Sequence, residues 1–585
     1  MKLKNKKIFL IILMFFIMNS IVNAKTGSIK LLAVSENDEK GSIANVNLEI
    51  KEGTGRVFID SYPLSKIDTQ ISTRFAKEVA CNFLEIDCSN FDFFYTIKAN
   101  SAIVGGPSAG AAISVLTIAV LSDLTIDEKT TMTGTINTGG IIGPVGGVLP
   151  KINAASDVGI KKVLIPKYSG LNETNLSEIE KKYNVKVIEV SFLEEALQEI
   201  TGKKYEKDFE INISNSYLKK MNNVAFDMCM RAEKLYNETK DYSENDEFFN
   251  ASLLYLQKGI NSTKNNEFYS SASYCFGSSL NAQYLKLKKE LDNENKIKKK
   301  INETKDLIYD YKKFVKEKKL NTITDLEVFM IVNDRLIEAE QRLNNALETN
   351  NTNQTIYHLA YSIERLNSAV SWANFFDING KKFSINKETM DESCLRKISE
   401  VEERMQYLKL YLPSGLEDVE ESIKNSYEDY NNQKPELCIY KASIAKAKVN
   451  LILNTMAIES KDVINLIEDR SFIVKKTIAK QNKREIFPIL AYSYYEYGNS
   501  LKYNDEYSAL LYLEYALELG NLDIYFEKSK ISLPKFDKKY VYVFVGGLII
   551  GILFGMALMH DFYKIKNKIK EKNNFNKDKE GKKKY

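Results

Sequence analysis

The sequence is poor in histidine, and this shortage limits the chemistry open to the chain. Its 585 residues contain two histidines, His358 and His560. A Ser-His-Asp or Cys-His site needs a histidine beside its nucleophile. Both histidines lie in the second half of the chain, so we do not expect histidine-dependent catalysis in the first half.

Cysteine-based metal sites are also lacking. The six cysteines contain no Cys-x-x-Cys pair, and with so little histidine a zinc site is not expected. We therefore predict no metal and no cofactor. Pairing between sequence neighbours would give three local disulfides, but six cysteines allow fifteen connectivities. The cysteines are Cys81, Cys88, Cys229, Cys275, Cys394 and Cys438.

A strong net charge is absent too. The formal charge of +4 is too small to indicate a nucleic-acid partner, and we predict none. Part of that charge comes from the Lys-rich residues 564–584, which have the composition of a solvated tail.

The N-terminus has the pattern of a signal peptide. Four lysines precede an apolar run at residues 8–18, and Ala24 follows at a plausible cleavage site. We predict a signal peptide over residues 1–24. An uncleaved anchor is the alternative, and it would also leave the next domain outside the cytoplasm.

A second apolar run lies near the C-terminus. Tyr540 to Met559 has no charged residue and is long enough to span a bilayer. Lysines follow it densely, which places the tail in the cytoplasm by the positive-inside rule. We predict a transmembrane helix over residues 540–562, a basic cytoplasmic tail over 563–585, and a body outside the cytoplasm.

Residues 25–203 have the patterns of an α+β domain. Alternating segments at residues 29–34, 45–50 and 55–59 predict a β-meander. Further strands are expected at residues 93–97, 131–138, 162–166 and 185–190. Helices are expected at residues 69–83, 111–121 and 192–201.

The texture changes at residue 207. No proline occurs between Pro166 and Pro413, and apolar residues recur at three- and four-residue spacing. We predict an all-α domain over residues 207–535, an irregular solenoid or bundle without a clean repeat. Within it, Ala491–Leu519 resembles a tetratricopeptide hairpin. Residues near that motif's positions are Tyr494, Gly498, Ala509 and Ala516.

Two glycine-rich turns carry the candidate chemistry. Ser108 stands between Gly105-Gly106-Pro107 and Ala109-Gly110, just before an apolar helix-like run. Lys151 follows a second glycine-containing turn. A desolvated lysine can accept a proton from serine near neutrality, so the pair can act as a Ser-Lys dyad. An ordinary helix-capping turn and a helix-start lysine are the structural alternatives.

These residues belong to an extended resemblance. Over roughly residues 26–200 the chain resembles the proteolytic domain of Lon-type serine peptidases, including archaeal-type relatives. The helical half has no part in it. The matching segments are Pro107-Ser108-Ala109-Gly110, Met132-Thr133-Gly134, Gly139 to Gly147, Lys151 with Ala154-Ala155, Gly159-Ile160-Lys161 and Val163 to Pro166.

The resemblance implies a role for each matching residue. Ser108 is the expected nucleophile, Lys151 the general base, and Thr133 the threonine that helps to hold the lysine. The oxyanion hole is expected in the backbone of the turn formed by Gly106, Pro107, Ala109 and Gly110. The chain departs from the family pattern at Thr135, where an acidic residue is usual, and at Gly105, which is often Asp in bacterial members.

The resemblance does not extend to the ATP-driven module of Lon. No Gly-x-x-x-x-Gly-Lys-Ser/Thr motif occurs, so the ATP-driven unfolding module of Lon is missing. We therefore expect an ATP-independent, membrane-anchored serine endopeptidase acting on extracytoplasmic proteins, with a helical domain that recruits or gates substrates. A homohexamer is expected from the resemblance alone. The alternatives are a non-catalytic surface scaffold that retains a Lon-like domain, and a peptidase that cuts mainly itself.

Overall fold

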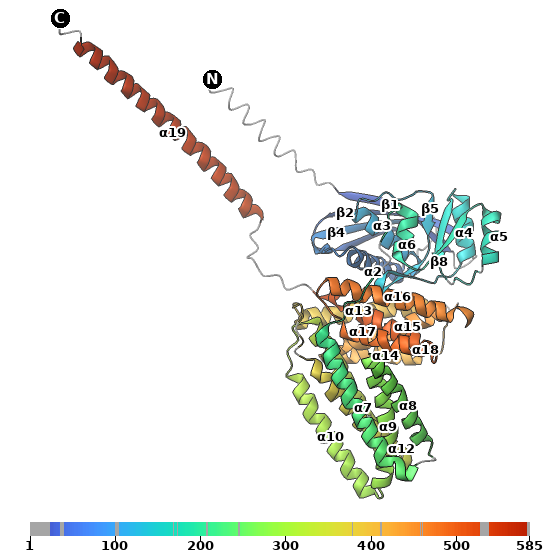
Figure 1. Cartoon of the computed structure of the whole chain (residues 1–585). Helices are drawn as coiled ribbons and strands as arrows, with labels where there is room; N and C mark the ends of the chain where they lie inside the picture. Colours follow the sequence, from blue (N-terminus) through green and yellow to red (C-terminus); the bar gives the residue numbers. More distant parts are fainter. Residues whose placement is uncertain are drawn as a thin grey trace. The chain divides into compact units, whose positions relative to one another are not determined.

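The computed structural model describes residues 24–34, 40–99, 105–167, 169–171, 173–205, 209–243, 246–376, 378, 380–409, 412–456, 458, 460–526 and 538–581. The chain divides into two compact units, Met1–Lys528 and Ser529–Tyr585. The first unit holds an α/β region followed by an all-helical region, and the second holds one long helix (Figure 1). The predicted signal peptide lies outside the described residues, apart from Ala24.

The α/β region is built on a seven-stranded mixed sheet in the order β3-β4-β2-β1-β5-β8-β9. The β1–β2 and β2–β4 pairs are antiparallel, and every other neighbouring pair is parallel. The strands are β1 Lys25–Val34, β2 Gly41–Glu52, β3 Val57–Tyr62, β4 Phe91–Ala99, β5 Thr130–Met132, β8 Lys162–Pro166 and β9 Lys186–Val190.

Helices cover both faces of this sheet. In the centre of β1, neighbouring side chains point to opposite faces, so Leu31 joins one core and Leu32 the other. The first core contains side chains of α2, α3 and α6, and the second contains side chains of α4 and α5. The helices are α2 Ile67–Leu84, α3 Gly110–Leu121, α4 Val148–Asp157, α5 Glu173–Tyr183 and α6 Leu193–Thr201.

The expected β-meander is wrong at its third strand. β3 does not pair with β2; it pairs in parallel with β4, and β4 lies between them. The chain reaches β4 through α2, and a helical crossover joins parallel strands. β3 is therefore the edge of the sheet.

The strand expected at residues 131–138 is also divided. β5 ends at Met132, and β6 (Thr135–Asn137) turns back through η3 (Thr138–Gly140) to pair with β7 (Ile141–Gly143) in a separate sheet. The division has a local cause. Gly134 donates its N–H to Ser108 O at 2.9 Å and accepts from Ala111 N at 3.0 Å. The serine turn takes the backbone groups that would have continued the strand.

The helical region packs around one large core. The helices are α7 Asn215–Ser243, α8 Glu247–Lys264, α9 Phe268–Glu290, α10 Glu294–Lys316, α11 Ile323–Glu348, α12 Thr352–Trp372, α13 Lys387–Lys409, α14 Glu417–Asn431, α15 Pro435–Thr455, α16 Val463–Lys483, α17 Ile489–Leu501 and α18 Glu506–Leu519. Short 3-10 helices are η1 Cys88–Asn90, η2 Pro107–Ala109, η4 Ala373–Phe375, η5 Ser460–Asp462 and η6 Leu522–Tyr525.

The two regions of the first unit contact each other along α2. Lys480 Nζ donates to Phe83 O at 3.3 Å, and Arg484 donates to Asn82 O at 3.2 Å. Lys446 Nζ lies 4.4 Å from the centroid of the Phe75 ring. These contacts attach α16 and α15 to the last turns of α2.

Three disulfides join cysteines that are neighbours along the sequence. Cys81 pairs with Cys88 at the end of α2. The other two cross-link helices of the helical region, Cys229–Cys275 between α7 and α9 and Cys394–Cys438 between α13 and α15. Neighbour pairing is thus the connectivity that the structure has among the fifteen possible.

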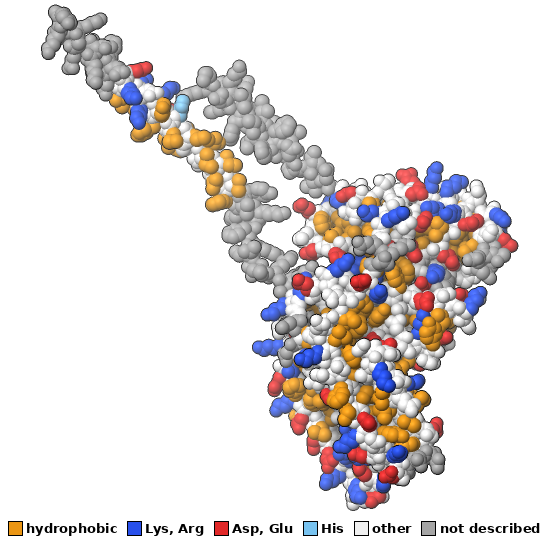
Figure 2. Space-filling view, in the orientation of Figure 1, with side chains coloured by type: hydrophobic (Ala, Val, Ile, Leu, Met, Phe, Trp, Pro, Cys, Tyr) orange, Lys and Arg blue, Asp and Glu red, His pale blue; other side chains and the backbone are white. Residues whose placement is uncertain are grey.

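The second unit contains α19 (Lys538–Gly581). Within it, Phe544–Glu571 is long and apolar enough to cross a membrane, by length and composition. Figure 2 shows its apolar side chains as a band along the helix, with basic side chains beyond it. A single C-terminal helix of this kind agrees with the predicted span.

Candidate active site

Ser108 lies in a tight turn at the start of α3. Gly106 has a φ of +98°, and the 3-10 turn η2 follows at once. Gly110 is required by the space around it, because a Cβ there would lie 2.8 Å from Ser72 Oγ and 2.9 Å from Ile136 Cγ2. The Ser108 side chain remains half-buried at the mouth of this turn.

The carbonyl groups of the turn are held from two sides. On one side, Ser108 O accepts from Gly134 N at 2.9 Å and from Thr133 Oγ1 at 3.4 Å. On the other, Ser72 Oγ of α2 donates to Pro107 O at 3.4 Å. The first N–H groups of a helix have no intrahelical acceptor and lie at the positive end of its dipole. Hydrogen bonds to its carbonyl groups thus hold the turn in place. The N–H groups at the start of α3 remain able to stabilise a negative charge.

Sequence reasoning missed this support from α2. Thr69 Oγ1 also contacts the turn, donating to Gly106 O at 3.5 Å. Both Thr69 and Ser72 are buried. The available signal was a cluster of small hydroxyl residues on the buried face of an amphipathic helix.

Lys151 comes from the first turn of α4. It follows Gly147, whose φ is +64°, and its side chain is 3% exposed. Its Nζ donates to Thr133 Oγ1 at 3.1 Å. Among the described residues no hydrogen bond joins Lys151 Nζ to Ser108 Oγ. Such contacts are often long in a ligand-free site and tighten when substrate binds.

Burial controls the charge of this lysine. Desolvation lowers the pKa of Lys151 to about 7, because a buried ammonium loses its hydration. No carboxylate within the described part of the chain forms an ion pair with it. A large share of Lys151 is therefore a neutral amine near neutral pH, which is the form that accepts a proton.

Thr133 links the two predicted residues. Its Oγ1 accepts the hydrogen bond from Lys151 and donates to the carbonyl of Ser108. Its own N–H donates to Leu164 O at 3.0 Å, which fixes the end of β5 against β8. The structure thus brings Ser108, Thr133 and Lys151 together from three separate elements.

Two departures from the family pattern have a place in the structure. Position 135 is a threonine that is buried in β6. The carboxylate that is usual at this position in the family is therefore absent. Gly105 lies beside the alkyl chain of Lys66, whose Cδ is 2.6 Å from where a Cβ would stand. Neither departure removes a member of the serine, threonine and lysine group.

Large apolar side chains are exposed between the end of β3 and the start of α2. Tyr62 ends the edge strand β3 and is 78% exposed, and Leu64 is 80% exposed. Ile67, at the start of α2, is 70% exposed. The hydrophobic pattern marked residues 55–59 as a strand but did not indicate the exposed apolar side chains that follow it.

Neither metal ligands nor histidine were expected in the α/β region. Within the described ranges, no group of three His, Cys, Asp or Glu side chains is placed to hold a metal ion. His358 belongs to α12 of the helical region and His560 to α19 of the second unit, so the α/β region itself contains no histidine.

Comparison with known proteins agrees with this geometry. Residues 79–202 match the Lon protease (S16) C-terminal proteolytic domain. The chain is 32% identical over 171 residues to an archaeal Lon protease of Archaeoglobus fulgidus, covering 28% of this chain and 26% of that protein. It is 37% identical over 97 residues to Lon protease 2 of Bacillus subtilis, covering 17% of each.

A Lon protease of Clostridium beijerinckii is 32% identical over 157 residues, covering 26% of this chain and 19% of that protein. The chain therefore spans about a quarter or less of the length of these curated relatives. The α/β region carries a Lon-type proteolytic domain.

Proposed function

We propose that the chain is an ATP-independent serine endopeptidase, with Ser108 as nucleophile and Lys151 as general base. The observation that carries the proposal is the buried Lys151, whose pKa is lowered to about 7 and whose Nζ is held by the same threonine that holds the Ser108 carbonyl. The match to a Lon-type proteolytic domain supports the reaction class.

The reaction follows from these positions. Neutral Lys151 accepts the proton of Ser108 Oγ while the oxygen attacks the substrate carbonyl carbon. N–H groups around Ser108 and the start of α3 stabilise the resulting oxyanion. The Lys151 ammonium then protonates the leaving amine, and an acyl-enzyme remains. Lys151 next takes a proton from water as the water oxygen attacks the ester carbon. The ammonium returns that proton to Ser108 Oγ as the C–O bond breaks, which releases the carboxylic acid product and the free serine.

The substrate must approach the serine turn, and the edge strand β3 offers a route. Tyr62 at its end, with Leu64 and Ile67 beyond it, exposes apolar side chains, and α2, which begins at Ile67, contacts the turn through Thr69 and Ser72. An extended peptide can add to a sheet edge through backbone hydrogen bonds. We infer that flexible or unfolded protein segments are the substrates, because the 585 residues contain no nucleotide-binding loop to drive unfolding.

We place the catalytic body outside the cytoplasm, anchored by α19. The apolar span with lysines beyond it supports this topology. Three disulfides support it as well, because disulfides persist in oxidising compartments. We further propose that the helical region recruits or gates substrates, and that the protein forms a homo-oligomer, a hexamer by resemblance to Lon.

Labelling of the serine tests the proposal. Full-length protein in detergent is incubated with a fluorophosphonate probe and, separately, with an unfolded protein substrate. We expect labelling and cleavage in the wild type and neither in Ser108→Ala. Lys151→Ala should lose cleavage while circular dichroism shows an intact fold. Ser122→Ala, at the other end of α3, serves as the matched control and should behave as wild type.

Two results would overturn the assignment. Full cleavage by either Ser108→Ala or Lys151→Ala would exclude the dyad. Absence of both labelling and cleavage in the wild type would favour a non-catalytic surface scaffold. Mass spectrometry of the mature termini separates a third outcome, a peptidase that cuts mainly itself, from cleavage of other proteins.

A further inference from the structure

A large cavity lies inside the helical region. Its volume is about 610 Å³. Its walls come from α7, α9, α11 and α12 on one side and from α14, α15, α17 and α18 on the other. None of its lining residues belongs to the α/β region, so the cavity is separate from the serine site.

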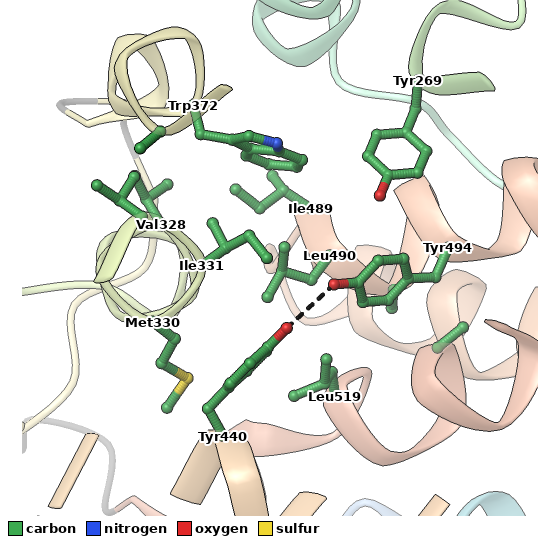
Figure 3. Packing of buried hydrophobic residues seen from close by; sticks show 14 of the residues in the cluster. Tyr269, Val328, Met330, Ile331, Trp372, Tyr440, Ile489, Leu490, Tyr494 and Leu519 are labelled. Carbon is green, nitrogen blue, oxygen red and sulfur yellow. Dashed lines mark hydrogen bonds between the residues drawn. The ribbon is translucent and has the colours of Figure 1, made fainter. Parts of the chain in front are cut away.

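Tyrosines form one wall of this cavity. Tyr440 and Tyr494 point their hydroxyl groups at each other, 3.3 Å apart (Figure 3). The rings of Tyr497 and Tyr512 meet edge to face at 4.7 Å. Burial raises the pKa of Tyr512 to about 12, so its hydroxyl stays protonated at any physiological pH. This wall therefore offers aromatic faces together with neutral groups that both donate and accept hydrogen bonds.

The charged groups that line the cavity balance one another. Arg365 Nε forms an ion pair with Glu338 at 2.7 Å. Two lysines that line the cavity are also paired, Lys441 with Asp429 and Lys448 with Asp418, each at 2.6 Å. The cavity is close to neutral once Asp334 and Arg335 are counted together.

Asp334 and Arg335 are the two charged lining residues that belong to none of these ion pairs. Asp334 accepts no hydrogen bond from another described residue, and burial raises the pKa of its carboxyl to about 6. The buried Nε of Arg335 has no hydrogen-bond partner, while the rest of the guanidinium interacts with the Tyr269 hydroxyl and lies 5.7 Å from the Trp372 ring centroid. An unpaired buried donor such as this Nε is costly unless a ligand satisfies it. One acceptor and one donor therefore stand side by side on α11.

The rest of the lining is aliphatic. Met221 and Met228 of α7 face the cavity, with Ile331 of α11 and Ile444 of α15. Methionine side chains are flexible and adapt to apolar groups of different shape. This part of the wall suits an apolar or aromatic side chain of the ligand.

The tyrosine wall, the balanced charge and the aliphatic wall together indicate the class of ligand. A phosphate or nucleotide needs a surplus of positive charge, which the balanced cavity lacks. An oligosaccharide would use the tyrosines but has no side chain for the methionine and isoleucine wall. A polypeptide backbone is neutral and presents donors and acceptors in equal number, and its side chains fill the aliphatic part.

We propose that this cavity binds an unfolded polypeptide segment, holding its backbone at Asp334, Arg335 and the tyrosine hydroxyls and one apolar or aromatic side chain at Met221 and Met228. The inference rests on the proposed function only in treating the bound polypeptide as substrate. Binding itself requires no catalysis. It gives the helical region a recruiting site of its own.

The test measures peptide binding to the full-length Ser108→Ala protein in detergent by fluorescence anisotropy. The probe is a fluorescein-labelled peptide of Gly, Ser and Asn residues around a central Leu-Phe pair. We expect saturable binding that is at least tenfold weaker when the central pair is Ser-Ser. Equal binding of the two peptides would overturn the proposal, and so would displacement of the probe by maltohexaose, which would indicate a carbohydrate site.

Isosteric variants locate the binding. Asp334→Asn and Tyr512→Phe keep the shape of the cavity, and each should weaken binding of the Leu-Phe peptide about fivefold, the value of one hydrogen bond. The matched controls are exposed residues of the same helices, Glu348→Gln on α11 and Tyr507→Phe on α18, and they should bind as the parent does. Unchanged binding in both cavity variants would overturn the assignment.

The two proposals fail separately. If the wild-type protein neither labels nor cleaves but the peptide still binds, the endopeptidase proposal falls and the cavity proposal stands. If the wild type cleaves but Ser108→Ala shows no binding that depends on the cavity, the reverse holds.

Discussion

Lys151 Nζ donates a hydrogen bond to Thr133 Oγ1 across 3.1 Å, and both side chains are buried. Burial lowers the pKa of this lysine. Its protonation state therefore depends on desolvation and on one neutral hydroxyl. This simplicity allows the effects of pH and of substitution to be given a direction.

The pH dependence of cleavage should follow Lys151. Because the pKa of Lys151 is lowered to about 7, the neutral base is lost as the pH falls below that value. We expect kcat/KM for a short peptide without titratable groups to rise about tenfold per pH unit below the pKa and to level off above it. Initial rates measured between about pH 5 and pH 9 test this. A rate that falls as the pH rises through 7 would contradict the role of Lys151 as base.

Removing the amine should stabilise the protein. An unfolded lysine titrates near ~10.4 and folded Lys151 near 7, so the unfolded state binds more protons between these values. Stability therefore rises with pH across that window, and below it the buried cation costs roughly 4 kcal/mol. Lys151→Met should raise the free energy of unfolding at neutral pH by a sizeable part of that cost.

Urea unfolding measures this change, with Lys161→Met, an exposed lysine, as control. A Lys151→Met protein that is less stable than the wild type at neutral pH would show that the amine contributes contacts worth more than its desolvation.

Thr133 should position the lysine. Thr133→Val keeps the side-chain shape but removes the oxygen that accepts from Nζ. We expect kcat/KM to fall roughly tenfold. The pH midpoint should also move lower, because the lost hydrogen bond favoured the ammonium form. Thr133→Ser should restore both.

The control is Thr131→Val, at a buried threonine of β5 whose hydroxyl donates to Lys30 O at 2.6 Å. It should reduce stability without moving the pH midpoint. If Thr133→Val lowers the rate with an unchanged midpoint, its role is structural only.

The disulfide between α13 and α15 should stabilise the helical region. Cys394 and Cys438 are 44 residues apart, and a loop of that length implies about 4 kcal/mol of stabilisation. The double variant Cys394→Ala, Cys438→Ala should lose about that much. Trp372 is the only tryptophan of the chain and is buried in this region, so its fluorescence reports the transition.

The comparison is the Cys81–Cys88 pair, which closes a loop of sequence separation 7. Its double alanine variant should cost about 2.5 kcal/mol by the same relation and should leave the Trp372 transition largely in place. An equal shift of the Trp372 signal in both variants would contradict this assignment.

The site was predictable where its residues lie in short motifs. The turn around Ser108, the Met132-Thr133-Gly134 segment and Lys151 were each identified from neighbouring residues, and the structure brings them together. Glycines whose positions are fixed by close packing, such as Gly110, make these segments recognisable. Because residues 25–203 contain no histidine, lysine was the expected general base before any contact was known.

Long-range relations were not predictable. No local pattern indicates that β4 inserts between β2 and β3, because strand order depends on how the α2 crossover packs. The contacts of Thr69 and Ser72 with the serine turn were not predictable for the same reason, because they depend on how α2 packs against the turn. In the sequence, the tyrosines of the helical region have the pattern of ordinary core residues. Only the packing of several helices shows that some of them line a cavity with Asp334 and Arg335.

Helix α2 links the two regions of the first unit. Thr69 and Ser72 hold the serine turn, while Asn82 and Phe83, at its other end, accept hydrogen bonds from α16. Heating that unfolds the helical region therefore removes the contacts that hold the C-terminal end of α2. Any cleavage that the chain performs should then stop at the temperature where Trp372 becomes solvated.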